Sequence, residues 1–129
     1  MEEQPAPAPE PEVFPLHSEW AGRYKCGQGF TGVRLVIDAH STGEAIATFE
    51  FGALPENPGV PSGAYQLRGR LQRTVDGGFE AKLSPDQWLD QPAGYVMVGV
   101  TAVTDAERHV LRGTIDSPAC SGFEVRRRR

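Results

Sequence analysis

Hydrophobic and polar residues alternate along most of the chain with a period of two. In the segment 30–39, for example, Val33, Leu35 and Ile37 alternate with polar residues such as Arg34. Because successive side chains of a β-strand point to opposite faces of a sheet, this pattern predicts strands with one buried face. The pattern recurs in eight segments, 19–26, 30–39, 44–52, 63–72, 78–84, 94–103, 109–116 and 120–125.

Two segments depart from simple alternation. Segment 94–103 is apolar at both sets of alternate positions, so we expect it to be the most buried strand. Segment 84–89 carries the signals of a helix start, since Ser84 can cap a helix and Pro85 suits its first position. Pro92 would end that helix. The sequence therefore predicts one short helix among the strands.

Glycines occur inside four of the predicted strands, at Gly22, Gly69, Gly99 and Gly113. Glycine weakens a strand, so its repeated use there needs a structural reason. Closing a sheet into a barrel requires sharp bends that glycine permits. Together with short turns such as the Asp-Gly pair in 75–78, this predicts an all-β fold, an antiparallel barrel of about eight strands. Two packed sheets, with glycine at bulges, are the alternative.

The chain has two cysteines, Cys26 at the end of the first predicted strand and Cys120 at the start of the last. If eight antiparallel strands close in order, the first and last are neighbours. We therefore expect a disulfide across the seam, closing a loop of roughly ninety residues and contributing about 4–5 kcal/mol. Two free buried thiols are the alternative. The disulfide would place the protein in an oxidising compartment.

Length and charge predict one domain with two tails. Residues 1–13, rich in Pro, Ala and Glu, are expected to be a disordered tail or linker, residues 14–125 the β-barrel domain, and residues 126–129 a solvated basic tail. The net charge of −4 is unchanged when both tails are set aside. Such a mildly acidic body argues against nucleic acid as a partner.

Neither end of the chain carries a recognisable targeting or membrane segment. The longest apolar run is far shorter than the roughly 18 residues of a membrane span, so none is predicted. The first residues lack the basic and apolar regions of a signal peptide, and read literally the protein is cytoplasmic. If Met1 replaces a removed signal or an upstream domain, the expected disulfide favours a secreted or periplasmic protein, which is our expectation.

Catalytic chemistry has few candidates. His40 lies between Asp38 and Ser41, from which a small hydrolase could be built, but the motif is more typical of a polar turn. No cysteine or histidine spacing is typical of a metal site. We therefore expect a protein that binds rather than catalyses, with no cofactor.

The aromatic residues suggest a binding surface. Trp20 and Tyr24 share one strand face, Trp88 falls in the predicted helix, and Tyr95 opens the apolar strand. Each is expected in the core or, alternatively, at a barrel mouth that takes a small apolar ligand under the helix as a lid. The loop 54–63, stiffened by three prolines, is a candidate protein-binding loop.

Two resemblances to known families follow from short motifs. The stretch "WAGRY" at 20–24 resembles the opening strand of the lipocalin and avidin barrels, although those families place glycine before the tryptophan. This resemblance implies an up-and-down barrel with a ligand in its mouth.

The stretches "YKCGQG" at 24–29 and "PSGAY" at 61–65 resemble motifs of bacterial periplasmic inhibitors of C-type lysozyme. In that family a loop serine and a downstream lysine enter the glycosidase cleft. The resemblance implies that Ser62 and Tyr65 in the loop motif, with Lys82 as the only lysine downstream, contact a protein partner. The longer serine motif of that family is missing here.

Overall fold

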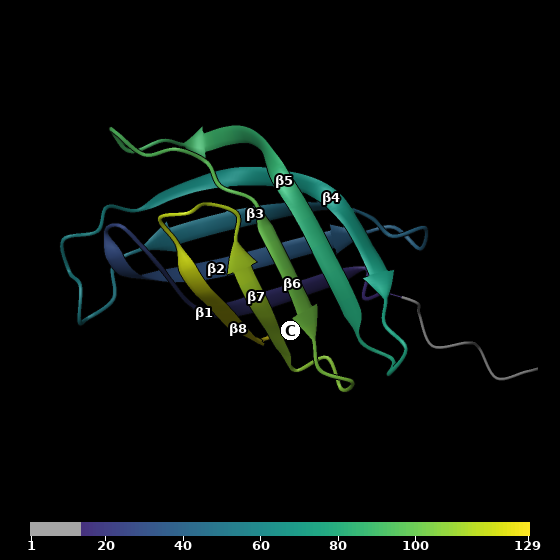
Figure 1. Ribbon diagram of the computed structural model, residues 1–129. Coiled ribbons are helices and arrows are strands. Elements are labelled where there is room, and N and C mark those ends of the chain that lie inside the picture. The colour runs from purple at the N-terminus through teal and green to yellow at the C-terminus, as the bar shows by residue number, and fades with distance from the viewer. Residues whose placement is uncertain (1–13) are drawn as a thin grey trace, which may run out of the picture.

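A computed structural model describes residues 14–129, so the predicted tail at 1–13 lies outside the described residues. The chain forms a closed antiparallel barrel in which each strand pairs with the next and β8 pairs with β1 (Figure 1). This confirms the all-β barrel and excludes the two-sheet alternative. The strands are β1 (His17–Cys26), β2 (Gly29–Ala39), β3 (Glu44–Gly52), β4 (Gly63–Arg73), β5 (Phe79–Asp90), β6 (Val100–Thr104), β7 (Val110–Ile115) and β8 (Ser121–Arg127).

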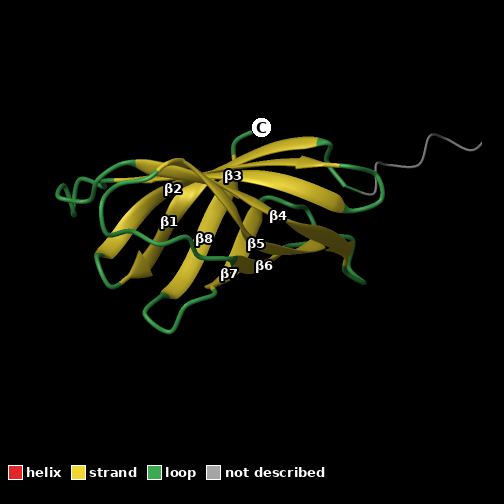
Figure 2. Ribbon diagram, turned by 90° about the horizontal axis from the view of Figure 1, so that it is seen from above, coloured by secondary structure: helices red, strands yellow, loops and turns green. Residues whose placement is uncertain are grey.

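The barrel has two different ends, which the strand directions define. We call one end the mouth; it carries the β1–β2 hairpin and the loops 53–62, 91–99 and 116–120. The other end, the base, carries the shorter loops after β2, β4 and β6, and the chain also enters and leaves the barrel there. Figure 2 shows the strands wrapping around a common interior, with the connections gathered at these two ends.

The core fills the barrel along the predicted apolar positions. In β2 the buried side chains alternate with exposed or half-buried ones, as the period of two predicts. Aromatic side chains contribute much of the volume, and Trp20 and Phe79 meet edge to face with ring centroids 6.1 Å apart. The largest fully buried side chains are those of Trp20, Tyr65, Phe49, Phe79, Phe123, Leu35, Ile37, Leu67, Leu83, Leu111, Val100 and Val125.

Three of the glycines predicted inside strands, Gly22, Gly69 and Gly113, lie where a neighbouring backbone comes too close for a side chain. A Cβ atom at Gly69 would lie 1.8 Å from the carbonyl oxygen of Lys82, and one at Gly22 would lie 2.0 Å from that of Glu124. Both distances are far below van der Waals contact. The reason that the structure gives for these glycines is therefore close backbone approach within the closed sheet, and the predicted bends stay a prediction. Gly99, the fourth glycine predicted inside a strand, lies in the 91–99 loop before β6.

The predicted helix at 84–89 is wrong. These residues belong to β5, which pairs with β4 along its whole length, from Phe79 to Asp90, with two irregularities in register. A continuous partner strand satisfies their backbone groups, which outweighs the local capping signal of Ser84 and Pro85. Proline is tolerated because β6 pairs only with the Glu80–Leu83 part of β5, leaving the rest as an edge. Residues 14–129 contain no helix.

The apolar segment 94–103 is not the most buried strand. Only residues 100–103 of the segment lie in a strand, β6, and Val96 and Val103 are 76% and 44% exposed. Its first half forms part of the 91–99 loop, where the hydroxyl of Tyr65 replaces a strand partner by bonding to both backbone groups of Val98. Sequence hydrophobicity alone does not distinguish a loop that covers a barrel mouth from a buried strand.

The last strand runs further than the sequence predicts. Strand β8 includes Arg126 and Arg127, which pair with Ala21 and Trp20 of β1. The predicted domain end at residue 125 thus lies inside a strand, and these two arginines belong to the barrel wall.

Candidate functional site at the barrel mouth

An apolar pocket of about 360 Å³ opens at the mouth of the barrel. Its wall combines aromatic side chains from the strands with residues of the 91–99 and 116–120 loops and with the disulfide. The lining residues are Tyr24, Cys26, Gly27, Gln28, Phe51, Tyr65, Gly94, Tyr95, Val96, Val98, Ser117, Ala119 and Cys120. No Asp, Glu, Lys, Arg or His lies among them, so the pocket presents no formal charge at neutral pH.

Stacked aromatic rings form one side of this pocket. The rings of Phe51 and Tyr95 are stacked, with centroids 5.4 Å apart and planes inclined by 16°. Behind them Phe49 stacks on Tyr65 with a centroid distance of 4.9 Å. Such offset pairs combine a large apolar area with fixed orientation. The mouth therefore has a preformed aromatic wall that joins the core.

Tyr65 fixes the loop that borders the pocket. Its hydroxyl donates to the carbonyl oxygen of Val98 at 3.0 Å and accepts from the Val98 N–H at 3.3 Å. Burial raises the pKa of Tyr65, against the opposing effect of its hydrogen bond to Val98. The side chain is only 1% exposed, so it acts through the loop and offers little surface to a protein partner.

Tyr24 is also held in its neutral form. Burial is the main cause that raises its pKa, and the neighbouring Tyr65 and Tyr95 raise it further, whereas hydrogen bonds with Thr31 and Gln28 lower it. A neutral phenol can both donate and accept a hydrogen bond. The pocket thus offers polar contacts suited to hydroxyl, carbonyl or ether groups of an otherwise apolar molecule.

The predicted disulfide is present and forms part of the pocket wall. Cys26 and Cys120 are bonded with their Cα atoms 3.9 Å apart, and the bond spans 94 residues of sequence. It joins the end of β1 to the residue before β8, next to a register shift between Tyr24 and Lys25. The geometric argument that the first and last strands meet is therefore confirmed.

Three of the four predicted ligand-binding aromatics gather at this end. Tyr24 and Tyr95 line the pocket, and Trp88 stands behind it, 5.2 Å from Tyr65 and 6.3 Å from Phe51 between ring centroids. Trp20 lies at the base of the barrel instead and is fully buried. Trp88 does not carry a helical lid, because it lies on β5; the 91–99 loop with Tyr95 borders the mouth in its place.

The structure does not bring Ser62 and Lys82 together. Ser62 is exposed in the loop before β4, at the mouth. Lys82 lies on β5 and pairs with Arg70 of β4. Arg70 is seven residues along β4 from Gly63, the residue that follows Ser62. At about 3.3 Å per residue, roughly 23 Å of strand separates these two levels.

The 53–62 loop is anchored to the neighbouring hairpin rather than free. The side-chain amide of Asn57 donates to the carbonyl oxygens of Gln28 and Phe30 at 2.8 and 3.0 Å. Beside it Arg23 bonds to Glu56 at 2.8 Å. Sequence reasoning singled out the prolines of this loop but missed Asn57, because its partners lie 27 and 29 residues away.

His40 is not assembled into a catalytic trio. Its backbone closes the turn after β2 through bonds with Glu44 and Gly43 at 2.8 and 2.9 Å. The carboxylate of Asp38 bonds to Nδ1 of His17 at 2.7 Å. Asp38, followed by Glu19, raises the pKa of His17.

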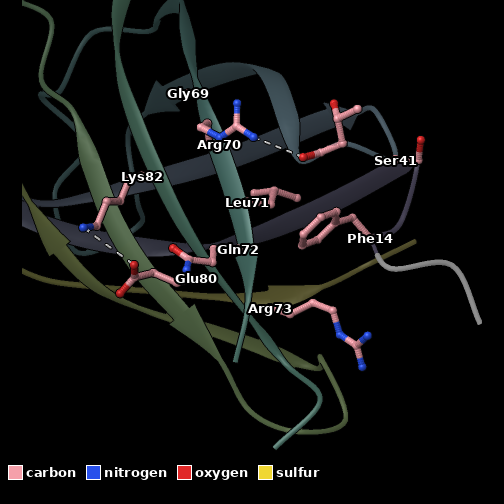
Figure 3. Close-up of a pocket in the computed structure, with 10 residues that line it drawn as sticks. Phe14, Ser41, Gly69, Arg70, Leu71, Gln72, Arg73, Glu80 and Lys82 are labelled. Atoms are coloured by element: carbon pink, nitrogen blue, oxygen red, sulfur yellow. Dashed lines mark hydrogen bonds and ion pairs between the residues drawn. The ribbon is translucent and has the colours of Figure 1, made fainter. Parts of the chain in front are cut away.

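A second hollow, of about 680 Å³, lies near the base along β4 (Figure 3). It is an open groove between Phe14, Ser41 and the residues 69–73, with Glu80 and Lys82 on its far side. Arg70 donates to the carbonyl oxygen of Thr42 at 3.2 Å, and Lys82 lies 3.8 Å from Glu80. Ser41 is exposed at its edge and contacts no base, so the groove presents no assembled nucleophile.

Comparison with known proteins adds no assignment. No family model matches the chain, and no curated protein or solved structure is significantly similar to it. Within residues 14–129 no group of three or more His, Cys, Asp or Glu side chains is placed to hold a metal ion. A helix able to cross a bilayer is likewise absent from that part of the chain.

Proposed function

We propose that this protein binds a small, uncharged and largely apolar molecule in the mouth of its barrel and catalyses no reaction. The observation that carries the proposal is the preformed aromatic pocket lined by Tyr24, Phe51, Tyr65 and Tyr95. Its volume of about 360 Å³ falls within the range of small-molecule sites, roughly 300–1,000 Å³.

The chemistry of the lining supports an uncharged ligand. A charged ligand would lose hydration on entering and would find no opposite charge among the lining side chains. The neutral hydroxyl of Tyr24, with Gln28 and Ser117 at the rim, supplies polar contacts that orient a ligand without requiring ionisation. The ligand class is therefore an aromatic or alicyclic compound with one or two oxygen functions.

The disulfide supports a secreted or periplasmic setting for this function. Disulfides persist in oxidising compartments and are rare in the cytosol. Here the bond is also part of the binding wall, so the same compartment that maintains the bond maintains the pocket.

A neutral fluorescent probe tests the mouth directly. N-phenylnaphthylamine should bind saturably, increase in emission and quench Trp88, because that indole contacts the aromatic wall. Ala119 is an exposed residue of the lining, so Ala119→Phe should fill the pocket and abolish probe binding without disturbing the core. The matched control is Ala106→Phe in an exposed loop at the base.

Two results would overturn the proposal. Either the probe and a panel of neutral aromatic compounds leave Trp88 emission unchanged, or Ala119→Phe binds the probe as well as the control does.

The anchored 53–62 loop supports a second candidate function, inhibition of a lysozyme-type hydrolase. Asn57 holds the loop against the β1–β2 hairpin, which leaves Ser62 exposed on a constrained backbone suited to docking. Cell-wall lysis by a C-type lysozyme should then be blocked by excess protein and restored when Ser62→Trp replaces it. Unchanged lysis in the presence of excess unmodified protein removes this candidate.

A further inference from the structure

The open hollow of about 680 Å³ along β4, here called the β4 groove, carries an excess of positive charge. Three basic side chains, those of Arg70, Arg73 and Lys82, lie among the residues that line it. The lining includes a single carboxylate, that of Glu80. A groove with this charge favours an anionic occupant.

Two of the basic residues are direct cross-strand partners. Arg70 of β4 pairs with Lys82 of β5, so their side chains share one face of the sheet at one level. Like charges placed opposite each other destabilise a sheet. Glu44 lies 3.7 Å from Arg70, and both side chains are exposed. Glu80 lies 3.8 Å from Lys82 in a similar way. Such long, exposed ion pairs are weak, so an anion in the groove would further offset the repulsion.

Arg73 adds a third charge toward the base end of the groove. It is the cross-strand partner of Phe79 and lies three residues along β4 from Arg70, or roughly 10 Å. Its side chain forms no ion pair with a carboxylate of residues 14–129. In Figure 3 the ring of Phe14 stands between Arg70 and Arg73. Cationic groups at two levels suit an extended segment that carries more than one carboxylate.

Phe14 fixes the point at which the chain enters the barrel, and it is itself part of the groove wall. Its buried ring meets that of Phe79 edge to face, with centroids 6.4 Å apart. A Cβ atom at Gly43 would lie 3.3 Å from the Phe14 ring, and the carbonyl oxygen of Gly43 accepts the N–H of Leu71 at 2.7 Å. The residues that precede Phe14 are therefore joined to the barrel at the β4 groove.

These preceding residues carry the charge opposite to that of the groove. Residues 1–13 include Glu2, Glu3, Glu10 and Glu12 and contain no Lys or Arg. Glu12 and Glu10 are two and four residues from the Phe14 anchor, so a chain can carry them at most about 7 and 14 Å from it. This reach is comparable to the spacing between the two cationic levels.

The covalent connection makes weak contacts sufficient for binding. Exposed ion pairs between separate molecules contribute little and are screened by salt. A segment tethered next to its site binds intramolecularly, at an effective concentration on the order of millimolar. An acidic segment of another protein would instead lose translational and rotational freedom on binding. The tether therefore favours the chain's own acidic residues as the occupant.

We propose that the β4 groove binds an acidic extended segment and that residues 1–13 of this chain are its occupant, with Glu10 and Glu12 facing the basic side chains. The contact lies along the outside of β4, toward the base of the barrel. It does not depend on the function proposed for the mouth.

Cross-linking without a spacer tests this contact in the full chain. A water-soluble carbodiimide joins a carboxylate directly to an amine, and the chain has two lysines, Lys82 in the groove and Lys25 near the mouth. At low ionic strength Glu10 or Glu12 should become linked to Lys82, which peptide mass spectrometry identifies. High salt should abolish the link because it screens the attraction. Lys25 is the internal control and should acquire no link to residues 1–13.

Charge variants separate ion pairing from mere proximity. The link should be lost when Arg70→Gln is combined with Arg73→Gln, which keeps Lys82 but removes its neighbouring charges; both arginines are exposed, so the fold is retained. Arg112→Gln is the matched control, since that arginine bonds to a carboxylate of β8 and should leave the link unchanged. Glu80→Gln should increase the link, because Glu80 lies 3.8 Å from Lys82 and competes for its amine.

Four results would overturn the proposal. Residues 1–13 may link to Lys25 as readily as to Lys82, or fail to link to Lys82 even in Glu80→Gln. The link may persist in high salt or in the double arginine variant. Finally, a mixture of isotopically labelled and unlabelled chains may yield links only between separate chains, which would assign the groove to a second copy instead.

Discussion

Gly69 shows how closely single residues are constrained by the coiling of the sheet. A methyl group there would lie 1.8 Å from the backbone oxygen of Lys82, which cannot move without breaking the β4–β5 ladder. We predict that Gly69→Ala lowers the free energy of unfolding by about 3 kcal/mol or more, at or above the usual cost of overpacking. Gly27→Ala, where nothing lies within 4 Å, should change it by less than about 0.5 kcal/mol. Urea unfolding measures both, and equal effects would contradict the argument.

The buried tyrosines predict a loss of stability in alkali. Burial raises the pKa of Tyr24 and of Tyr65 above the ordinary value of 10.0 that both recover on unfolding. Above about pH 10 the unfolded chain releases these protons while the folded chain retains them, so stability is complete below that pH and falls as the pH rises. Urea midpoints measured from pH 8 to 11 should decline in the upper part of this range. Tyr65→Phe should decline less steeply, since one titrating group has been removed.

At the same scale, residues with a purely geometric role could be predicted from the sequence, whereas residues defined by distant partners could not. The strand glycines and the cysteine pair follow from closing a sheet of eight strands, whatever the loops do. Asn57 was missed because its two acceptors belong to another hairpin. The position of Trp20 at the base was missed because alternation assigns a face of the sheet but not a level along the barrel.

At the scale of the element, β5 explains why the helix prediction failed and suggests how its edge is protected. Beyond Leu83 it has no β6 partner, and this edge carries Pro85 and two register shifts. Proline and bulges are known devices against pairing between molecules. We predict that Pro85→Val promotes self-association, visible as larger species in sedimentation velocity. Pro58→Val, in an exposed loop, should remain unchanged, and monomeric behaviour of both variants would contradict this reading.

At the scale of the whole molecule, the Cys26–Cys120 bond links the two ends of the barrel domain covalently, at the place where β1 and β8 also pair. By the chain-entropy model, a loop of 94 residues contributes about 4–5 kcal/mol. We predict that Cys26→Ser combined with Cys120→Ser lowers the free energy of urea unfolding by that amount. Reductant should lower the stability of the unmodified protein to the same level and leave the double variant unaffected. Probe binding at the mouth should weaken in parallel, because both sulfurs line the pocket.

The architecture as a whole could be predicted because it follows from one assumption. If the first and last strands pair with each other, the order of every strand between them is fixed. The split of 94–103 into a loop and a strand could not, since it depends on the Tyr65 hydroxyl occupying the place of a ladder partner. The sequence therefore predicts that Tyr24 and Tyr95 lie at the barrel mouth, but it does not predict the 91–99 loop that borders the mouth.

Because the barrel has an even number of antiparallel strands, both chain ends of the domain lie at its base, and this limits how it can be fused to another protein. The chain enters β1 and leaves β8 on the same side, where Arg128 donates its backbone N–H to Glu19 at 2.6 Å. Attachment through either terminus, or insertion of the barrel into a surface loop of a host protein, would orient the aromatic pocket outward toward the solvent. When the protein is immobilised on a sensor chip by its C-terminus, the pocket at the mouth should remain fully accessible to ligands in solution.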